Sequence, residues 1–353
     1  MKKFAALVVA TAVVSAAPAW AEDDDGSPQF TFGASTSFVY DGNSPNGGTA
    51  AFNALTYANQ EPRDETFNID LMQIGVSGQR GNASYKAAVD FGDLAALADN
   101  SSDSDVSLQE AWVAYDREHV GLTAGRFGTP IGYEVLEPWG NRHVSRSWGW
   151  QAQPINHDGL IGRGNADTID VSIGVVNSFT VASNPVGVND TNDDKGIIGS
   201  FSAAPSDALN FHFAGYVEND GAENQMVNAI VSGLLPFGEQ YDLSYGVEGN
   251  WRKTKPGGGS NDFWNFTGYF GANYGPTGLD LRVDYTDDDG IVTPISTELW
   301  SLTLTGSWAL VDSVDFRVEY RHDDAEDSVF GDGSGSDDTI NTVQVQLVWN
   351  PEL

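Results

Sequence analysis

The chain has 353 residues and no cysteine, and its 50 acidic residues against 17 lysines and arginines give a formal net charge of -33. This excess of negative charge repels phosphate and argues against nucleic-acid binding, while the lack of thiols excludes disulfides, cysteine-ligated metals and a cysteine nucleophile. A hydrophobic content of 40% with 11% aromatic residues still indicates a folded chain rather than an acidic disordered one.

The first 21 residues have the features of a secretory signal peptide. Lys2 and Lys3 precede an apolar run from Phe4 to Val14, and Ala19-Trp20-Ala21 places small residues at a cleavage site. That run is too short to span a bilayer, and no later run of about 18 apolar residues follows. We therefore expect residues 1–21 to be removed on export. Residues 22–353 then form a secreted soluble protein or an outer-membrane barrel.

From Gln29 onward the chain repeats one unit, a segment of alternating polarity followed by a turn or loop. In Leu279 to Tyr285, apolar residues alternate strictly with Asp, Arg and Asp. A period of two places the apolar residues on one face of a strand and the charged ones on the other. The pattern predicts sixteen strands, near residues 29–40, 65–78, 82–91, 105–117, 119–127, 156–163, 166–177, 195–204, 208–218, 223–234, 239–253, 262–274, 278–286, 296–309, 312–322 and 338–349.

Short turns and long polar loops alternate between the predicted strands. The long loops lie at residues 41–64, 92–104, 128–155, 178–194, 254–261, 287–295 and 323–337, and only the link near 219–222 breaks the rule. Outer-membrane barrels have short periplasmic turns and long outer loops, and sixteen strands enclose a lumen too wide for side chains to fill. The sequence therefore predicts an all-β protein, a transmembrane antiparallel β-barrel in the bacterial outer membrane. The alternative is a large secreted sandwich or jelly roll with one wet face.

In such a barrel the polar face of each strand lines an aqueous lumen. The lumen-lining residues are then Asp242, Glu248, Arg252, Asp280, Arg282, Asp284, Asp315, Arg317, Glu319 and Arg321. Acids outnumber bases among the charged wall and loop residues, and a field of that sign raises the local concentration of cations. We expect a preference for cations.

The loop at about 128–155 combines acids, arginines and tryptophans more densely than any other part of the sequence. A loop of this kind after a middle strand can fold into the lumen, narrow it and sort solutes by charge. We expect Glu134, Glu137, Arg142 and Arg146 to form the pore constriction, together with Asp158. A solvent-facing outer loop is the alternative.

Three segments around this loop give the chain a resemblance to a known family. The run Gly125-Arg126-Phe127-Gly128-Thr129-Pro130-Ile131-Gly132-Tyr133-Glu134, the segment from Asn141 to Ser147, and His157 to Gly162 resemble the OmpL-like β-barrel porin family (putative β-barrel porin-2). The resemblance implies a bacterial outer-membrane channel for passive diffusion of small hydrophilic solutes and ions. It requires no cofactor. Its expected partners are outer-membrane lipid, lipopolysaccharide and, by association of wide barrels, a homotrimer.

Two other functions compete with a channel. An adhesin or structural barrel would use its acidic loops as a working surface and need not conduct. An outer-membrane hydrolase would need a nucleophile beside one of the five histidines, yet the sequence contains no nucleophile-elbow or His-Glu-x-x-His pattern. Acidic clusters such as residues 287–289 could bind divalent cations, but Asp190 to Phe201 departs from the calcium-loop pattern and we expect no metal site.

Overall fold

The computed structural model describes residues 27–41, 66–95, 106–181, 195–220, 222–237, 241–255, 259–293, 295–330 and 337–349. The expected signal peptide, at residues 1–21, lies outside these ranges. So do the acidic clusters at residues 23–25 and 190–194. In the part of the chain that is described, no helix is long and apolar enough to cross a membrane.

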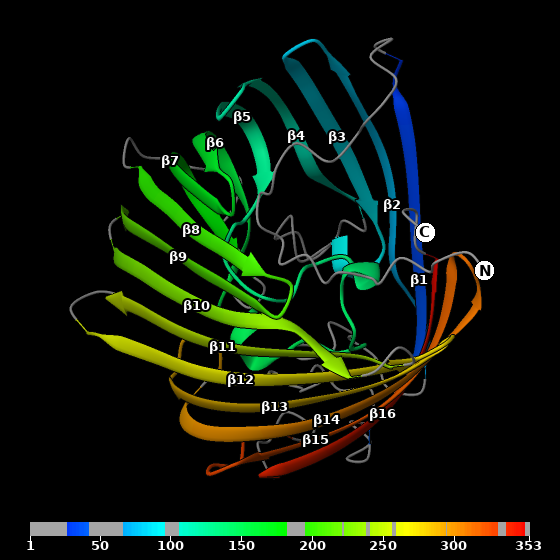
Figure 1. Ribbon diagram of the computed structural model, residues 1–353. Coiled ribbons are helices and arrows are strands. Elements are labelled where there is room, and N and C mark those ends of the chain that lie inside the picture. Colours follow the sequence, from blue (N-terminus) through cyan, green and yellow to red (C-terminus); the bar gives the residue numbers. More distant parts are fainter. Residues whose placement is uncertain are drawn as a thin grey trace.

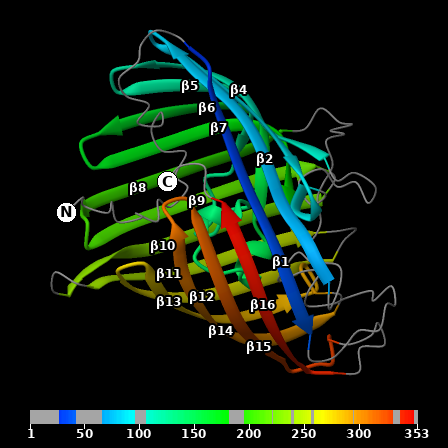
Figure 2. The same cartoon turned by 90° about the vertical axis from the view of Figure 1, so that its right-hand side faces the viewer.

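Sixteen antiparallel strands form a closed barrel in which every strand pairs with its sequence neighbours and β1 pairs with β16. The strands are β1 (Gln29–Asp41), β2 (Thr66–Arg80), β3 (Ala83–Phe91), β4 (Val106–Arg117), β5 (Val120–Gly128), β6 (Pro154–Ala166), β7 (Ile169–Val181), β8 (Gly196–Ser206), β9 (Leu209–Asp220), β10 (Ala222–Phe237), β11 (Tyr241–Lys255), β12 (Asn261–Tyr274), β13 (Thr277–Asp289), β14 (Ser296–Val311), β15 (Val314–Ala325) and β16 (Thr339–Trp349). Figures 1 and 2 show the closed wall from two sides. The prediction of sixteen strands is confirmed, with ends that shift by a few residues.

The tight turns lie on one end of the barrel, as expected. Two-residue links join β2 to β3 and β12 to β13, and each begins with a glycine in the left-handed region, Gly81 at φ 58° and Gly275 at φ 57°. A residue with a Cβ is strained in that conformation, so glycine is favoured at both sites. This end of the barrel faces the periplasm by the loop-length rule.

The burial pattern is the reverse of that in a soluble protein. Along β13, Leu279 and Val283 are about half exposed, at 54% and 47%, whereas Asp280, Arg282 and Asp284 between and beside them are at most 2% exposed. Exposed apolar side chains recur on the outer face of β2, β4, β7, β9 and β12. Exposure of such a continuous apolar surface to water is unfavourable. This face is therefore stable only where it contacts the hydrocarbon of a membrane.

The inward face is less uniformly polar than the sequence predicted. Ile161, Val176, Ile198 and Met226 point inward from β6, β7, β8 and β10 and are buried. They break the expected rule that apolar strand residues face lipid. The reason is that a second layer of protein covers them inside the barrel, so they form a small hydrophobic core.

A buried polar cluster joins the first and last strands. The Asp70 carboxylate on β2 accepts hydrogen bonds from Ser35 and Ser37 on β1 and from Gln346 Nε2 on β16, the last two at 2.6 and 3.0 Å. Charge-assisted hydrogen bonds are stronger than neutral ones. Asp70 therefore links three strands across the seam where the barrel closes.

Candidate functional site

Residues 129–153, which link β5 to β6, fold into the barrel and are called the inner loop below (Figure 1). The inner loop contains two short helices, η2 (Pro138–Gly140) and α2 (Trp148–Gln151). Ser147 caps α2 by accepting a hydrogen bond from the Trp150 backbone N–H. The inner loop is buried along most of its length, because it contacts much of the surrounding wall.

The first part of the inner loop is held by apolar packing. Ile131 joins Phe127 and the inward residues of β6 to β10 in one hydrophobic cluster. Beside it, the His212 ring contacts the Pro130 carbonyl oxygen through Nε2 at 2.7 Å. This contact attaches the entry of the inner loop to β9.

An ion pair fixes the middle of the inner loop to β13. Arg282 Nη1 lies 2.7 Å from Glu134 Oε1, and the same guanidinium donates to the Ser145 carbonyl and hydroxyl at 2.9 and 2.8 Å. Burial favours the neutral form of Glu134, but Arg282, Arg146 and the hydrogen bonds from Ser147 outweigh it and hold the pKa of Glu134 below its usual value. The carboxylate therefore stays charged and paired.

Arg146 supports the inner loop from within. Its guanidinium donates to the carbonyl oxygens of Val135, Val144 and Leu136 at 2.8 to 3.0 Å and lies 5.7 Å from the centre of the Trp150 ring. Burial lowers the pKa of Arg146 to about 10, which leaves it protonated at neutral pH. Arg146 thus holds two stretches of the inner loop together rather than facing solvent.

Acids of the barrel wall accept backbone N–H groups of the inner loop. Glu319 accepts from Val144 and Ser145 at 2.7 and 2.9 Å, and Asp284 accepts from Trp148 at 2.9 Å. The Trp148 indole N–H donates to Asp323 at 2.8 Å. Buried carboxylates need such partners, because an unpaired buried charge is very costly.

The turn of the inner loop reaches the opposite side of the barrel. Arg317 donates to the Pro138 carbonyl at 3.0 Å, and the Trp139 ring lies so close to Gly33 of β1 that a Cβ there would sit 2.4 Å from it. Gln73 of β2 donates to Glu137 at 3.4 Å. The inner loop is therefore attached to β1, β2 and β16 as well as to β9–β15.

The ten residues predicted to line the lumen are on strands of the wall, with their side chains on its inward face, but most of them contact the inner loop rather than water. Glu248, Arg252, Asp280, Arg282, Asp284, Arg317, Glu319 and Arg321 are all buried, whereas Asp242 is exposed and Asp315 partly so. The sequence pattern gave the inward direction of these side chains. It could not show that a second layer of chain covers them.

The five residues predicted for the constriction do not lie together. Glu134 and Arg146 are buried among the contacts that hold the inner loop, whereas Glu137 and Arg142 keep some access to solvent. Asp158 pairs in register with Arg126 and lies two residues from the outward, 47% exposed Leu160, so it faces outward from the barrel. Including Asp158 in a lumen site was wrong, because the inward positions on either side of it belong to His157 and Gly159.

Asp158 instead forms an ion pair on the outer face of β5 and β6. Arg126 Nε and Nη2 donate to its two carboxylate oxygens at 2.7 and 2.8 Å. The sequence analysis missed this pair, although both residues are in the motif segments that suggested the family. Their pairing depends on the register between β5 and β6, which local alternation does not specify.

Solvent reaches inward ion pairs on β3, β4 and β6. Lys86 pairs with Glu110, and their side chains are 33% and 16% exposed; Arg163 pairs with Asp116 at 2.9 Å, and these are 16% and 36% exposed. In contrast, both members of the Arg282–Glu134 pair are at most 4% exposed. The space left open by the inner loop therefore borders the wall made by β3 and β4.

Glu137 brings the inner loop to this open space, because both Lys86 and Glu110 act on its carboxyl group. Burial raises the pKa of Glu137, an effect that nearby Lys86 opposes and nearby Glu110 reinforces. We call the space between Glu137 of the inner loop and the inward residues Lys86 and Glu110 the side opening.

Two histidines contact buried hydroxyl groups, the arrangement that a hydrolase would need, and a third, His157, contacts the partly buried Thr129 hydroxyl. His143 Nδ1 lies 2.7 Å from Thr305 Oγ1, which also donates to Glu319 at 2.7 Å, and His212 Nδ1 lies 2.8 Å from Ser202 Oγ. All these side chains are buried beneath the inner loop or against it. A substrate carbonyl cannot approach either hydroxyl, so neither contact forms an accessible nucleophile.

A closed sixteen-stranded barrel with an apolar outer face and a loop folded into its charged interior defines an outer-membrane porin. The chain belongs to the family described as "Putative beta-barrel porin-2, OmpL-like", whose model matches residues 30–350. The protein is therefore a porin of the bacterial outer membrane, as the resemblance implied.

Solved porin structures share the fold at low sequence identity. The anion-selective porin from Comamonas acidovorans is 13% identical, with a TM-score of 0.62 over 92% of this chain and 99% of that one. Pseudomonas putida OprB is 11% identical, with a TM-score of 0.60 over 92% and 94%. A trimer form of Vibrio cholerae OmpT is 13% identical, with a TM-score of 0.58 over 92% and 99%. No curated protein matches the chain in sequence.

Proposed function

We propose that this porin is a passive, cation-preferring channel for small hydrophilic solutes and ions, with the side opening as its narrowest part. The observation behind this proposal is the difference in solvent access between the two halves of the wall. Inward ion pairs of β3, β4 and β6 are reached by solvent, whereas the Arg282–Glu134 and Arg321–Asp323 pairs on β13 and β15 are covered by the inner loop. Permeation then runs beside β3 and β4 and needs no cofactor or chemical step.

The charges around the side opening support cation preference. Glu110 and Glu137 border it together with Lys86, so acids outnumber bases. Arg142 of the inner loop is paired with Asp280 of β13 at 2.6 Å, which compensates its charge. The Comamonas porin is described as anion-selective, so local charges, and not the fold, must decide the sign of selectivity.

The test is the reversal potential in a planar bilayer under a KCl gradient. We expect the wild-type channel to favour K⁺ and Glu137→Gln to weaken that preference, because one acid of the side opening is lost. Glu118→Gln, which removes an exposed charge at the periplasmic turn before β5, is the matched control and should change little. An anion-favouring wild type, or equal effects of the two variants, contradicts the proposal; a barrel that does not conduct favours the adhesin or structural alternative.

Acidification should weaken the cation preference before it loosens the inner loop. The usual pKa of a glutamate is 4.5, and the pKa of Glu137 is raised above it. As the pH falls, Glu137 is therefore protonated and loses its charge while the pH is still above 4.5. The pKa of Glu134 is lowered, so its ion pair with Arg282 persists above 4.5 and is lost only as the pH falls through that lower value. As the pH is lowered from neutral to below 4.5, the reversal potential should therefore change first, and the single-channel conductance should change only at lower pH. A conductance change that accompanies the selectivity change would contradict this order, and Glu137→Gln should flatten the selectivity curve.

The outer surface supports the remaining partners of the proposal. Outer-membrane lipid and lipopolysaccharide would surround the apolar face. The Arg126–Asp158 pair is an exception on that face, because charged side chains towards lipid are unfavourable. A second copy of the chain would cover this pair, which supports the homotrimer, the state named for the Vibrio cholerae OmpT structure.

A further inference from the structure

The ammonium group of Lys86 lies among three carboxyl groups at the side opening. Lys86, on the inward face of β3, forms an ion pair with Glu110 of β4. It also interacts electrostatically with Glu137 of the inner loop and with Asp90, which is further along the same face of β3. A primary ammonium group is thus already seated among these acids.

Neutral donors hold the three carboxyl groups in place. Gln73 Nε2 of β2 donates to Asp90 Oδ1 at 2.9 Å and to Glu137 Oε1 at 3.4 Å. Trp112 Nε1 donates to Glu110 Oε1 at 3.1 Å, and the Trp112 ring packs against the inward hydrophobic cluster described above. The acids therefore keep their positions whether or not Lys86 stays beside them.

Lys86 is the movable member of this group. Its side chain is 33% exposed, compared with 16% for Glu110 and complete burial of Asp90. A lysine ammonium is a point charge on a flexible four-carbon stem, and an ion pair that solvent reaches contributes little to stability. The ammonium can therefore leave Glu110 for solvent while the acids remain.

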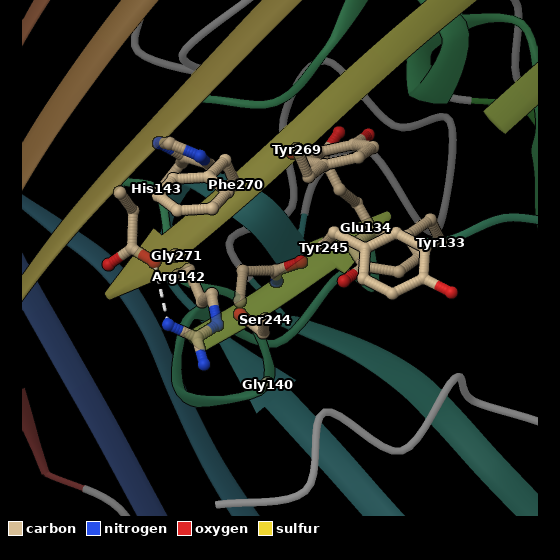
Figure 3. A pocket seen from close by; sticks show the side chains of 12 residues that line it. Tyr133, Glu134, Gly140, Arg142, His143, Ser244, Tyr245, Tyr269, Phe270 and Gly271 are labelled. Atoms are coloured by element: carbon tan, nitrogen blue, oxygen red, sulfur yellow. Dashed lines mark hydrogen bonds and ion pairs between the residues drawn. The ribbon is translucent and has the colours of Figure 1, made fainter. Parts of the chain in front are cut away.

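The acids have further capacity for a cation. Asp90 Oδ2 is buried and has no hydrogen-bond partner among the described residues. Burial, reinforced by Glu110, raises the pKa of Glu137, as expected where negative charge is incompletely compensated. Arg142, another cation of the inner loop, does not compensate it, because Arg142 pairs with Asp280 of β13 at 2.6 Å (Figure 3).

We propose that the side opening binds the primary ammonium group of an organic cation in exchange for the ammonium of Lys86. When Lys86 turns towards solvent, the incoming group takes the vacated place beside Glu110 and Glu137. The site therefore needs no cavity beyond the space that the Lys86 ammonium occupies, and the three N–H donors of the solute meet carboxylate oxygens.

Lys86 also limits how long the solute stays. Because it returns to compete for the same acids, the bound cation is released again, as permeation requires. This inference rests on the proposed channel function and adds the class of solute that the side opening retains.

The test uses single wild-type channels in a planar bilayer and n-butylammonium, which has the four-carbon chain and ammonium group of a lysine side chain. It should reduce the K⁺ current in a saturable manner. Tetramethylammonium has the same charge but no N–H donor and should need at least about tenfold more, because a tenfold change is about 1.4 kcal/mol, close to the value of one hydrogen bond to a charged group. A conducting channel that neither ion blocks, or that both block equally, overturns the ammonium site and leaves the channel function intact. A barrel that does not conduct overturns both.

Variants locate the block. Lys86→Ala removes the competing ammonium, so the half-blocking concentration of n-butylammonium should fall severalfold, since the apparent affinity rises with the fraction of time that the acids are accessible. A lysine with only a structural role would not strengthen the block when removed. Lys253→Ala is the matched control, because Lys253 is 28% exposed and pairs with Asp262 at 3.4 Å on the outward face of β11, and it should behave as wild type.

A second variant keeps the test decisive if Lys86→Ala does not assemble. Glu110→Gln removes one acid of the site and should raise the half-blocking concentration of n-butylammonium. Unchanged block in an assembled Lys86→Ala or Glu110→Gln channel overturns the proposed location.

Discussion

Replacing Arg282 by methionine should release the inner loop and raise the single-channel conductance severalfold. Arg282 is completely buried and donates to Glu134, to both Ser145 oxygens and to Thr303. Removing one partner of a buried ion pair leaves the other charge uncompensated, at a cost of about 3–5 kcal/mol. The free energy that holds the inner loop against the wall falls by about this amount. A displaced inner loop then widens the passage. Bilayer recordings and the size limit for sugars entering proteoliposomes measure the effect.

Two controls separate loop release from simple loss of charge. Arg80→Met removes an exposed arginine at the periplasmic end of β2 and should leave the conductance unchanged. The double variant Arg282→Met with Glu134→Met removes both buried charges, which is often nearly neutral, so it should restore much of the wild-type conductance. A single Arg282→Met variant with wild-type conductance and size limit would refute this account of the inner loop.

Replacing Val283 by arginine should impair assembly of the barrel, even though its two neighbours in the sequence are charged. Val283 faces outward between the inward Arg282 and Asp284, and the side chain is 47% exposed. An arginine facing lipid near the bilayer midplane costs about 2–4 kcal/mol. Folding yield in phospholipid vesicles and denaturant unfolding of the folded fraction measure this loss.

Asp287→Arg is the matched control, because Asp287 is on the same outward face of β13 but near its outer end. The cost near the interface falls to about 0–1 kcal/mol. Equal losses in the two variants, or none in Val283→Arg, would show that this face does not contact hydrocarbon.

The architecture follows from local sequence rules because alternation is a property of single strands. Leu279 to Tyr285 shows the period of two directly, and the burial of Asp280, Arg282 and Asp284 agrees with it. The alternation of short and long links predicted which end of the barrel faces the periplasm. Glycines such as Gly81 and Gly275 marked two of the short turns. None of these signals depends on contacts between distant parts of the chain.

The candidate site depends on distant contacts, and the sequence predicted it less well. Pro138 meets Arg317, and Glu134 meets Arg282, across separations of 179 and 148 residues. Alternation shows that Arg282 and Arg317 point inward but not what they meet there. The density of arginine and tryptophan at residues 128–155 singled out the loop that lies inside the barrel, but it did not show which wall residues this loop contacts. The position of Asp158 follows from strand alternation, which puts its side chain on the other face of β6 from that of His157.

The arrangement of the inner loop separates the residues that hold it from those that border the passage. Attachment depends on β9–β16 and the seam strands, while Lys86 and Glu110 of β3 and β4 face the remaining space. Substitutions at positions 86 and 110 can therefore alter which ions cross without undoing the folded interior. In evolutionary terms, this barrel can acquire new permeability while its framework stays under independent selection.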